Sequence, residues 1–349
     1  MNSNVTGIIF SNLHDSDIPM LTGKRTMGAV PFGGRYRLVD FPLSAMVNAG
    51  VTDVRVIAHH NYQSLMEHVG AGKDWDLARR IGGIRIVPPF SRAYATASEC
   101  YDTRIDSFLS IKGELARIDT PDILCADCDV VGTPDLGALI KAHRASGAGL
   151  TVGTVSRMED QPDPSLHIFV AKTDFLHAVL REAEEKQYTS FQVDIIERES
   201  KKGNVAYFPF HNRFFRMGSL TDYYALHMLL VENEGVRAEL LENKDAPIYT
   251  ATRSAPPVKY GRDAFARSSL VADGCVINGE VKNSVLFGGV FVGEGCVVEN
   301  AIIMENCTLT ENSHLAFGVL DKNATLFGGA SLHGHKTLPL FVEEGRRIG

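Results

Sequence analysis

From Ser268 onward the chain consists of very short apolar segments that repeat at steps of five to six residues, and this ladder constrains the fold more than any other feature. Its clearest members are Cys296-x-Val298, Ala301-x-Ile303 and Cys307-x-Leu309. Small residues suit inward positions, and Gly or Asn suits tight corners because both tolerate positive φ. The corner candidates are Gly274, Gly279, Gly288, Gly293, Gly295, Asn300, Asn306 and Asn312. An antiparallel β-sandwich needs strands of about five to six residues, so the pattern instead predicts a left-handed parallel β-helix of hexapeptide repeats over residues 268–349.

Residues 1–235 show a different pattern, in which apolar strand-like runs alternate with helix-like segments. The strand-like runs are Gly7–Phe10, Val54–Ala58, Ile84–Val87, Ile123–Ala126 and Leu150–Val155. The helix-like segments are Ser44–Ala49, Gln63–Val69, Ser98–Ile111, Asp135–Ser146 and a connecting helix at Thr221–Glu234. This alternation predicts a Rossmann-like α/β domain with a mainly parallel sheet and ligands at the carboxyl ends of its strands. Residues 236–267 are expected to link the two domains.

The overall composition excludes several classes of partner. A net charge of −7 argues against nucleic acid, whose phosphates require clustered Lys and Arg. No apolar stretch approaches the roughly 18–20 residues that span a bilayer. The first residues carry no secretory signal, so a cytoplasmic protein is expected.

The pair Cys125 and Cys128 forms a CxxC motif directly after an apolar run. Zinc requires four ligands, and no second pair or histidine cluster accompanies this one in the sequence. We therefore interpret the motif as strand-end packing.

One stretch, Ala29–Ser44, combines features that suit a phosphorylated ligand. Its paired glycines allow close backbone approach, Arg35 and Arg37 offer cationic donors, and Asp40 could orient one of them. A tight turn with solvated arginines explains the same residues without a ligand.

This stretch, together with Asn48–Val51, resembles the corresponding block of the glucose-1-phosphate adenylyltransferase family. The resemblance continues through Tyr62–His68, Gly72–Leu77, Gly218–Tyr224 and Ser269–Ile277, and so covers essentially the whole chain. The segment Gly72–Leu77 is similar to that of the D-type subunit found in Gram-positive and related bacteria. The resemblance implies a GT-A-like nucleotidyltransferase domain followed by the β-helix. Active members of the family join ATP and glucose-1-phosphate into ADP-glucose and pyrophosphate, using Mg²⁺ held by carboxylates.

Several positions depart from the active family's pattern. The loop at residues 11–17 lacks the glycines and arginine that hold a triphosphate, and Met27 stands where the family has a second lysine. Ala95 replaces a glycine near the adenine, and Ser156–Asp163 lacks the sugar-phosphate lysine. The family's glucose-contacting serine is matched by Ser165.

The metal ligands implied by the resemblance are also incomplete. Asp129 matches the first metal aspartate, with Asp127 as a second candidate, but Arg216 replaces the other metal aspartate and His167 replaces a glycine. A guanidinium repels a cation and cannot ligate Mg²⁺. We therefore expect no bound metal, with Asp129 as a vestigial ligand; Mg²⁺ is expected as a cofactor only if the site is active.

The preferred hypothesis is a non-catalytic or weakly active regulatory subunit of glucose-1-phosphate adenylyltransferase in glycogen biosynthesis. It would assemble with a catalytic subunit into a hetero-oligomer, expected to be a tetramer. Lys24, Arg25, Arg35 and Arg37 could hold a sugar phosphate or another anionic effector. The alternative is an active adenylyltransferase with an altered metal site.

A third hypothesis, an acyltransferase working on the β-helix, would use one of His314, His333 or His335. Packing at coil edges or exposure to solvent explains these three histidines more simply.

Overall fold

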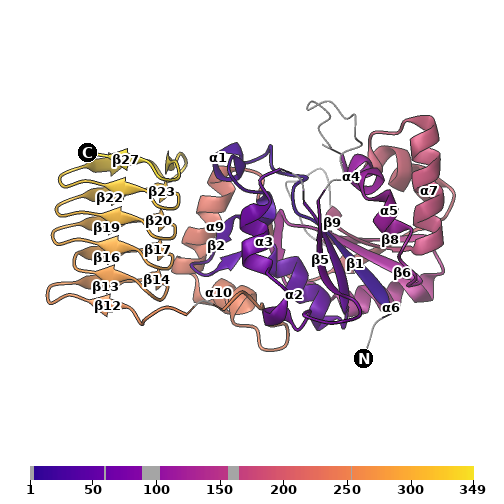
Figure 1. The fold of residues 1–349 in the computed structure, drawn as a ribbon, viewed down its shortest axis with the longest axis horizontal. Coiled ribbons are helices and arrows are strands. Elements are labelled where there is room, and N and C mark those ends of the chain that lie inside the picture. The colour runs from indigo at the N-terminus through magenta and orange to yellow at the C-terminus, as the bar shows by residue number, and fades with distance from the viewer. Residues whose placement is uncertain (1–3, 59, 89–102, 156–164, 253) are drawn as a thin grey trace.

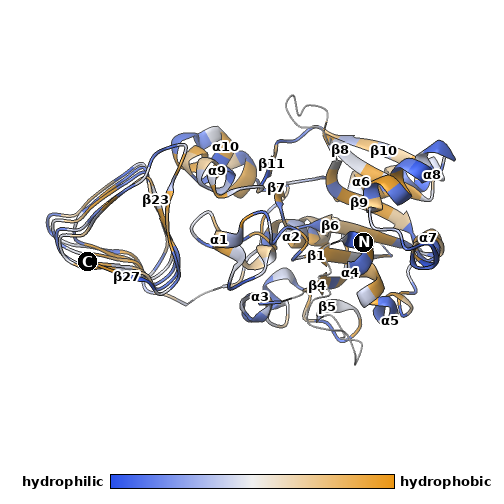
Figure 2. Cartoon of the chain, turned by 90° about the horizontal axis from the view of Figure 1, so that it is seen from above, coloured by the Kyte–Doolittle hydropathy of each residue, from blue (hydrophilic) through white to orange (hydrophobic). Residues whose placement is uncertain are grey.

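The computed structural model describes residues 4–58, 60–88, 103–155, 165–252 and 254–349. An α/β domain and a β-helix lie side by side, and helices α9 and α10 lie between them (Figure 1). Viewed along its axis, the β-helix has the triangular outline of three sheets that meet at corners (Figure 2). The predicted fold class is confirmed in both parts.

The α/β domain is built on a seven-stranded sheet with the order β10-β8-β9-β6-β1-β4-β5. The strands are β1 (Val5–Phe10), β4 (Asp53–Ile57), β5 (Gly83–Val87), β6 (Asp122–Asp127), β8 (Leu150–Val155), β9 (Ser165–Lys172) and β10 (Val205–Phe210). All neighbours are parallel except β9, which runs antiparallel to both β6 and β8. The start of β9 therefore lies beside the carboxyl end of β6, where a parallel sheet binds its ligands.

Helices cover both faces of this sheet because side chains alternate along each strand. In β1, Ile9 packs into one core and Ile8 into the other. One face is covered by α2 (Asp40–Asn48), α3 (Gln63–Val69) and α6 (Leu136–Ser146). The opposite face is covered by α4 (Arg104–Ser110), α5 (Lys112–Leu115), α7 (Thr173–Lys186) and the π-helix η3 (Phe191–Glu197).

The remaining elements of this domain are short and lie around the sheet. They are α1 (Pro19–Thr22), η1 (Met27–Ala29), β2 (Pro31–Phe32), β3 (Tyr36–Arg37), η2 (Lys73–Trp75), β7 (Val130–Gly132), α8 (Arg198–Lys201), β11 (Phe214–Arg216), α9 (Leu220–Glu232) and α10 (Glu234–Leu241). Ser219 caps α9 by accepting the Asp222 N–H, and Asn233 caps α10 by accepting the Val236 N–H. Among the described helices, none combines the length and apolar character that a bilayer crossing requires.

The predicted helix at residues 98–111 is partly outside the described residues, and its described part begins at Arg104. Neither β9, β10 nor α7 was predicted. The predicted connecting helix is found as α9 and is followed by a second helix, α10.

The β-helix consists of three parallel sheets whose strands have two or three residues. The sheets are β12-β15-β18-β21-β24-β27, β13-β16-β19-β22-β25 and β14-β17-β20-β23-β26. The first sheet comprises Lys259–Tyr260, Val276–Ile277, Phe291–Val292, Thr308–Leu309, Thr325–Leu326 and Arg347–Ile348, in that order. The second comprises Phe265–Arg267, Glu280–Lys282, Val297–Glu299, His314–Ala316 and Ser331–His333, and the third comprises Leu270–Val271, Val285–Leu286, Ile302–Ile303, Gly318–Leu320 and Leu340–Val342. The first coil therefore begins at Lys259, ahead of residue 268.

The corners of the β-helix confirm only part of the expectation about positive φ. Asn300, Asn306 and Asn312 have φ of 49°, 60° and 59°, and two of the five glycines predicted at corners are also positive. Gly279 is not in this region, but an added Cβ there would lie 2.5 Å from the Cys296 carbonyl oxygen. Glycine is needed there for close packing between coils.

The two domains share one apolar core. Along β17, Leu286 points into the β-helix, whereas Val285 points out and packs with the α/β domain. The Tyr224 hydroxyl of α9 donates to the Asn300 carbonyl, 2.6 Å away. Packing and hydrogen bonding therefore hold the β-helix against the domain that carries the strand ends.

Candidate functional site

The carboxyl end of β6 carries two buried aspartates. Asp127 is the last residue of β6, and Asp129 directly precedes β7; their exposed fractions are 3% and 1%. A buried carboxylate requires cations, hydrogen-bond donors or a metal around it. The surrounding groups come from four other segments of the chain, namely the loop after β1, α4, β9 and β11.

Two histidines face these aspartates from neighbouring segments. His14 lies in the loop after β1, and His167 lies near the start of β9, which runs antiparallel to β6 and so reaches the end of β6 that carries Asp127. The two imidazole rings are stacked, with centroids 5.2 Å apart and planes 7° from parallel. We call His14, Asp127, Asp129 and His167 the strand-end cluster.

The ligand atoms of the strand-end cluster all lie within 4.8 Å of one another. His14 Nε2 is 2.9 Å from Asp127 Oδ2 and 3.6 Å from Asp129 Oδ2. His167 Nδ1 is 3.4 Å and 3.5 Å from the same two oxygens. The four atoms thus enclose a small volume between three segments.

Two arginines border the strand-end cluster on opposite sides. Arg104 of α4 donates to both oxygens of Asp127, at 2.7 and 2.6 Å, in the bidentate geometry typical of a strong ion pair. Arg216, the last residue of β11, pairs with the start of β7, and its Nε lies 3.6 Å from Asp129 Oδ2. The predicted replacement of a metal aspartate by Arg216 thus puts a guanidinium beside Asp129.

Burial and neighbouring charges shift the pKa values of Asp127 and His14 in opposite directions. Burial alone would raise the pKa of Asp127, but the Arg104 guanidinium and the His14 hydrogen bond hold it below its usual value. Burial would lower the pKa of His14, but its hydrogen bond to Asp127 and the charge of Asp129 raise it. Asp127 is therefore ionised at neutral pH and attracts cations.

The loop after β1 makes its own internal contacts instead of forming a phosphate cradle. Asp15 Oδ1 accepts the Met27 N–H at 2.6 Å, and Asp17 Oδ2 lies 3.2 Å from His14 Nδ1. Burial raises the pKa of Asp15 to about 7. Within the loop, the Asp15 and Asp17 amides donate to the Asn12 and His14 carbonyls, so these amides are already engaged and not directed at a triphosphate.

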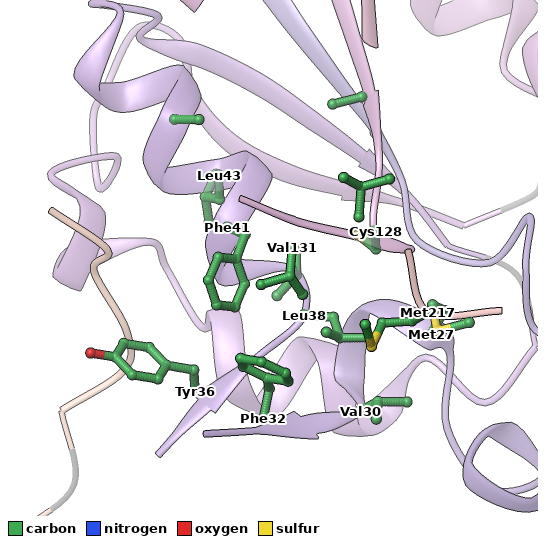
Figure 3. Close-up of a cluster of buried hydrophobic side chains, with 14 of the residues drawn as sticks. Met27, Val30, Phe32, Tyr36, Leu38, Phe41, Leu43, Cys128, Val131 and Met217 are labelled. Atoms are coloured by element: carbon green, nitrogen blue, oxygen red, sulfur yellow. The ribbon is translucent and has the colours of Figure 1, made fainter. Parts of the chain in front are cut away.

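Met27, at the family's lysine position, is buried with an exposed fraction of 1%. Its side chain belongs to an apolar cluster with Leu38, Val131 and Met217 (Figure 3). This position therefore contributes to the core and offers no charge to a ligand.

Of the four basic residues predicted to bind an anion, two are buried in contacts between the domains and two are exposed. Arg25 is 2% exposed and pairs with Asp321 at 2.9 Å and with Glu344 at 2.8 Å, both in the β-helix. Arg37 is also buried; it donates to the Ala29 carbonyl and lies 3.5 Å from Glu305. Both arginines thus join the two domains.

The other two predicted cations, Lys24 and Arg35, are exposed. Lys24 Nζ lies 3.2 Å from the Glu344 carbonyl, and the Arg35 guanidinium lies over the Tyr36 ring. Asp40, expected to orient an arginine side chain, accepts the Arg37 backbone N–H and contacts His68 Nε2 at 2.6 Å. That role for Asp40 was wrong, because its second oxygen is held by a histidine of α3.

Ser165 begins β9 and pairs in register with Thr154, close to the strand-end cluster along the chain. Ala95 and the Ser156–Asp163 segment lie outside the described residues. His14, Arg104 and the site role of His167 were not predicted. One usable signal existed, because His14 follows the first strand and strand ends converge in this fold; the antiparallel β9 gave no such signal.

The CxxC motif is structural. Cys125 packs on one face of the sheet and Cys128 on the other, and both are buried thiols without a disulfide. Burial raises the pKa of both thiols, which disfavours the thiolate that zinc requires.

Mg²⁺, the metal of active adenylyltransferases, does not fit the strand-end cluster. Mg²⁺ demands octahedral oxygen coordination. Two of the four donor atoms that point into this site are imidazole nitrogens, so the site does not supply the oxygen ligands that Mg²⁺ requires. We therefore derive no catalytic step through Mg²⁺ in this chain.

Comparisons with known proteins agree with both domains. A nucleotidyl transferase family model matches residues 19–163, and a model described as GlmU-like, C-terminal hexapeptide matches residues 256–334. The glycogen biosynthesis protein GlgD of Bacillus subtilis (strain 168) is 30% identical over 99% of this chain and 97% of its own length. GlgD of Geobacillus stearothermophilus is 31% identical over 85% of this chain and 84% of its own length.

A glucose-1-phosphate adenylyltransferase of Clostridium perfringens (strain 13 / Type A) is 29% identical over 86% of this chain and 84% of its own length. These matches span both domains, as the sequence resemblance predicts. The chain belongs to the family that comprises the GlgD glycogen biosynthesis proteins and the glucose-1-phosphate adenylyltransferases.

Proposed function

We propose that this chain is a non-catalytic or weakly active regulatory subunit of glucose-1-phosphate adenylyltransferase, supporting ADP-glucose synthesis for glycogen in the cytoplasm. The observation that carries the proposal is the pairing of Asp127 and Asp129, at the carboxyl end of β6, with arginine side chains. Arg104 holds Asp127 by both oxygens, and Arg216 lies beside Asp129. Catalysis of phosphoryl transfer depends on positioned phosphates and metal-borne charge, and at this edge both aspartates have arginine side chains beside them.

The nucleotide side of the site supports the same proposal. The loop after β1 directs Asp15 at a backbone amide, and Met27 is buried in the core. Removing an oriented electrostatic group costs on the order of 10²–10³ in rate. Several such losses together leave little turnover.

The proposed partner is a catalytic subunit of the same family, in a hetero-oligomer that we expect to be a tetramer. The β-helix exposes several aromatic side chains, and solenoid faces of this kind often pack against a neighbour. The exposed aromatic residues are Tyr260, Phe265, Phe291 and Phe327.

A sugar phosphate or another anion remains the proposed effector. Because Arg25 and Arg37 are committed to ion pairs between the domains, the exposed Lys24 and Arg35 remain as two separate candidate positions, which line different cavities. Lys24 lines a cavity of about 850 Å³ between α1 and the end of the β-helix, which His333 and His335 also border.

The test measures ADP-glucose formation from ATP, Mg²⁺ and glucose-1-phosphate. We expect negligible turnover by this chain alone, and altered substrate affinity or effector response when it is added to a catalytic subunit from the same organism. Identical kinetics of the catalytic subunit with and without this chain would overturn the proposal. Turnover by this chain alone that disappears in Asp129→Asn would instead establish the active alternative.

A further inference from the structure

We propose that His14, Asp127, Asp129 and His167 form a tetrahedral site for a divalent transition-metal ion of the Zn²⁺ class. The proposal goes beyond the regulatory function and does not depend on it. Two imidazole nitrogens and two carboxylate oxygens are donors that Zn²⁺ accepts, whereas Mg²⁺ prefers oxygen ligands alone. The site is thus chemically different from the Mg²⁺ site that it replaces.

The separations between the donor atoms match tetrahedral geometry. Zn²⁺ with bonds of about 2.0–2.1 Å holds its ligand atoms roughly 3.3–3.4 Å apart. The four histidine-to-aspartate separations are 2.9, 3.6, 3.4 and 3.5 Å, so they scatter closely around this edge length. The other two donor separations, His14 to His167 and Asp127 to Asp129, are within 4.8 Å, so a single ion can reach all four atoms once these pairs close in around it.

Asp129 provides an independent indication of a missing ligand. Its exposed fraction is 1%, and within the described part of the chain neither carboxylate oxygen has a hydrogen-bond partner. The charged groups nearest to Oδ2 are 3.5 to 3.6 Å away, longer than a hydrogen bond to a charged donor. A buried carboxylate left in this way is costly unless it binds a cation.

The groups behind the donors are arranged as in known zinc sites. A ligating histidine usually presents its other nitrogen to a carboxylate, which fixes the tautomer and raises its basicity. His14 does so, because its Nδ1 lies 3.2 Å from Asp17 Oδ2 while its Nε2 faces the cluster. Arg104 plays the corresponding part for Asp127 by hydrogen bonding both of its oxygens.

The backbone at His167 is consistent with a constrained functional position. Its φ is +55°, in the left-handed region that favours glycine, at a β-bulge between β8 and β9. This conformation costs a histidine about 1–2 kcal/mol relative to ordinary strand geometry. A bound ion would join this residue to the loop after β1 and to the end of β6, and thus tie three segments together.

The test is metal binding by the full-length protein, freed of metal with a chelator and then titrated with Zn²⁺ or Co²⁺. We expect one ion per chain by calorimetry and by elemental analysis after gel filtration. The Co²⁺ form should show the intense visible absorption of tetrahedral coordination, and millimolar Mg²⁺ should not displace either ion.

Substitutions of the proposed ligands test where the ion binds. Asp129→Asn and His167→Asn should each weaken Zn²⁺ binding at least tenfold, and asparagine tolerates the positive φ of residue 167. His314→Asn, which removes an exposed histidine of the β-helix, is the matched control and should bind like the original chain. His14→Gln, on the surface loop, gives a further readout if a core variant fails to fold.

The proposal fails if the original chain binds no stoichiometric Zn²⁺, which would mean that hydrogen bonds and ion pairs alone hold the cluster together. It also fails if Asp129→Asn, His167→Asn and His14→Gln all bind as the original chain does, since the ion would then lie on surface histidines or elsewhere. Octahedral Co²⁺ spectra with ready displacement by Mg²⁺ would contradict the assigned coordination.

Discussion

Two groups of buried charges, one at the domain interface and one at the strand ends, differ in how completely their members are paired. At the domain interface, Arg25 contacts Asp321 and Glu344 directly, and Arg37 lies near Glu305. At the strand ends, Arg104 donates to both oxygens of Asp127, while both oxygens of Asp129 lack hydrogen-bond partners among the described residues. The first group holds domains together, and the second retains capacity for a ligand.

The difference teaches that residue type alone does not identify a binding site. Arginines in a glycine-rich motif suggest phosphate, yet the fold places Arg25 and Arg37 opposite carboxylates of the β-helix. Histidines far apart in the sequence give no signal of a shared site. In the structure, the rings of His14 and His167 stack on each other beside Asp127 and Asp129. Four predictions test this contrast, beginning with the largest expected effect.

Arg25→Met should destabilise the protein by about 3–5 kcal/mol, because it leaves the buried Asp321 without its partner. Urea unfolding measures the loss. Lys24→Met is the matched control; its exposed amine contacts the same Glu344 segment, and its removal should cost at most about 1 kcal/mol. Equal losses for the two variants would show that the Arg25 ion pairs do not stabilise the interface.

His227 should make the stability of the interface depend on pH. Its Nε2 accepts the Gly33 N–H and its Nδ1 contacts the Tyr223 carbonyl, and burial lowers the pKa of His227 from 6.5 to about 4. Below about pH 6.5 the unfolded chain binds a proton that the folded chain does not, so stability falls as the pH drops from about 6.5 to about 4.

The loss assigned to His227 is on the order of 3 kcal/mol. His227→Gln removes the titrating group, and unfolding of both proteins at several pH values measures the difference. Parallel stability profiles for the two proteins would show that His227 is not the group responsible.

Zn²⁺ should stabilise the protein by about 2.7 kcal/mol at a free concentration one hundred times its Kd, since an ion bound only by the folded chain shifts the equilibrium by mass action. Thermal unfolding with and without Zn²⁺ measures the shift. Arg25→Met should show the same increment, because the two charge groups share no ion-pair partner and such sites act additively. A smaller increment in that variant would mean that the two charge groups are coupled.

Arg216→Asp should raise the affinity for Mn²⁺ or Mg²⁺ about tenfold, or about 1.4 kcal/mol, by removing a positive charge near Asp129 and adding an oxygen ligand. Electron paramagnetic resonance of Mn²⁺ follows the change. Arg213→Asp, an exposed arginine that pairs with Glu239, is the control. Turnover should stay low, because Met27 and the loop after β1 are unchanged. An unaltered Mn²⁺ affinity would contradict the assigned role of Arg216.

Much of the fold could be predicted because it follows from short-range patterns of apolar and polar residues. The hexapeptide ladder predicted the β-helix, and five apolar runs matched β1, β4, β5, β6 and β8. The strand β9 was missed because its first residue follows a polar segment and its pairing partners, β6 and β8, are distant in sequence. The antiparallel direction of β9 depends on tertiary packing and cannot be read from the periodicity of the sequence.

The candidate site divides in the same way. Asp129 and Arg216 could be matched to family positions, and their proximity at 3.6 Å agrees with that match. His14 and Arg104 could not, because His14 lies in the loop matched to the triphosphate site, where the pattern has no metal ligand, and Arg104 matches no family site position. Their roles depend on where the loop after β1 and helix α4 pack.

By itself, the sequence determined the two-domain architecture and the corners at Asn300, Asn306 and Asn312. These are local properties of spacing and residue type. Only the tertiary structure decided which charges meet. It paired Arg25 with Asp321 across the domains, and it brought His14 and His167 to Asp127 and Asp129. Contacts between segments far apart in the chain depend on how the strands pair and the helices pack, and no local pattern encodes that.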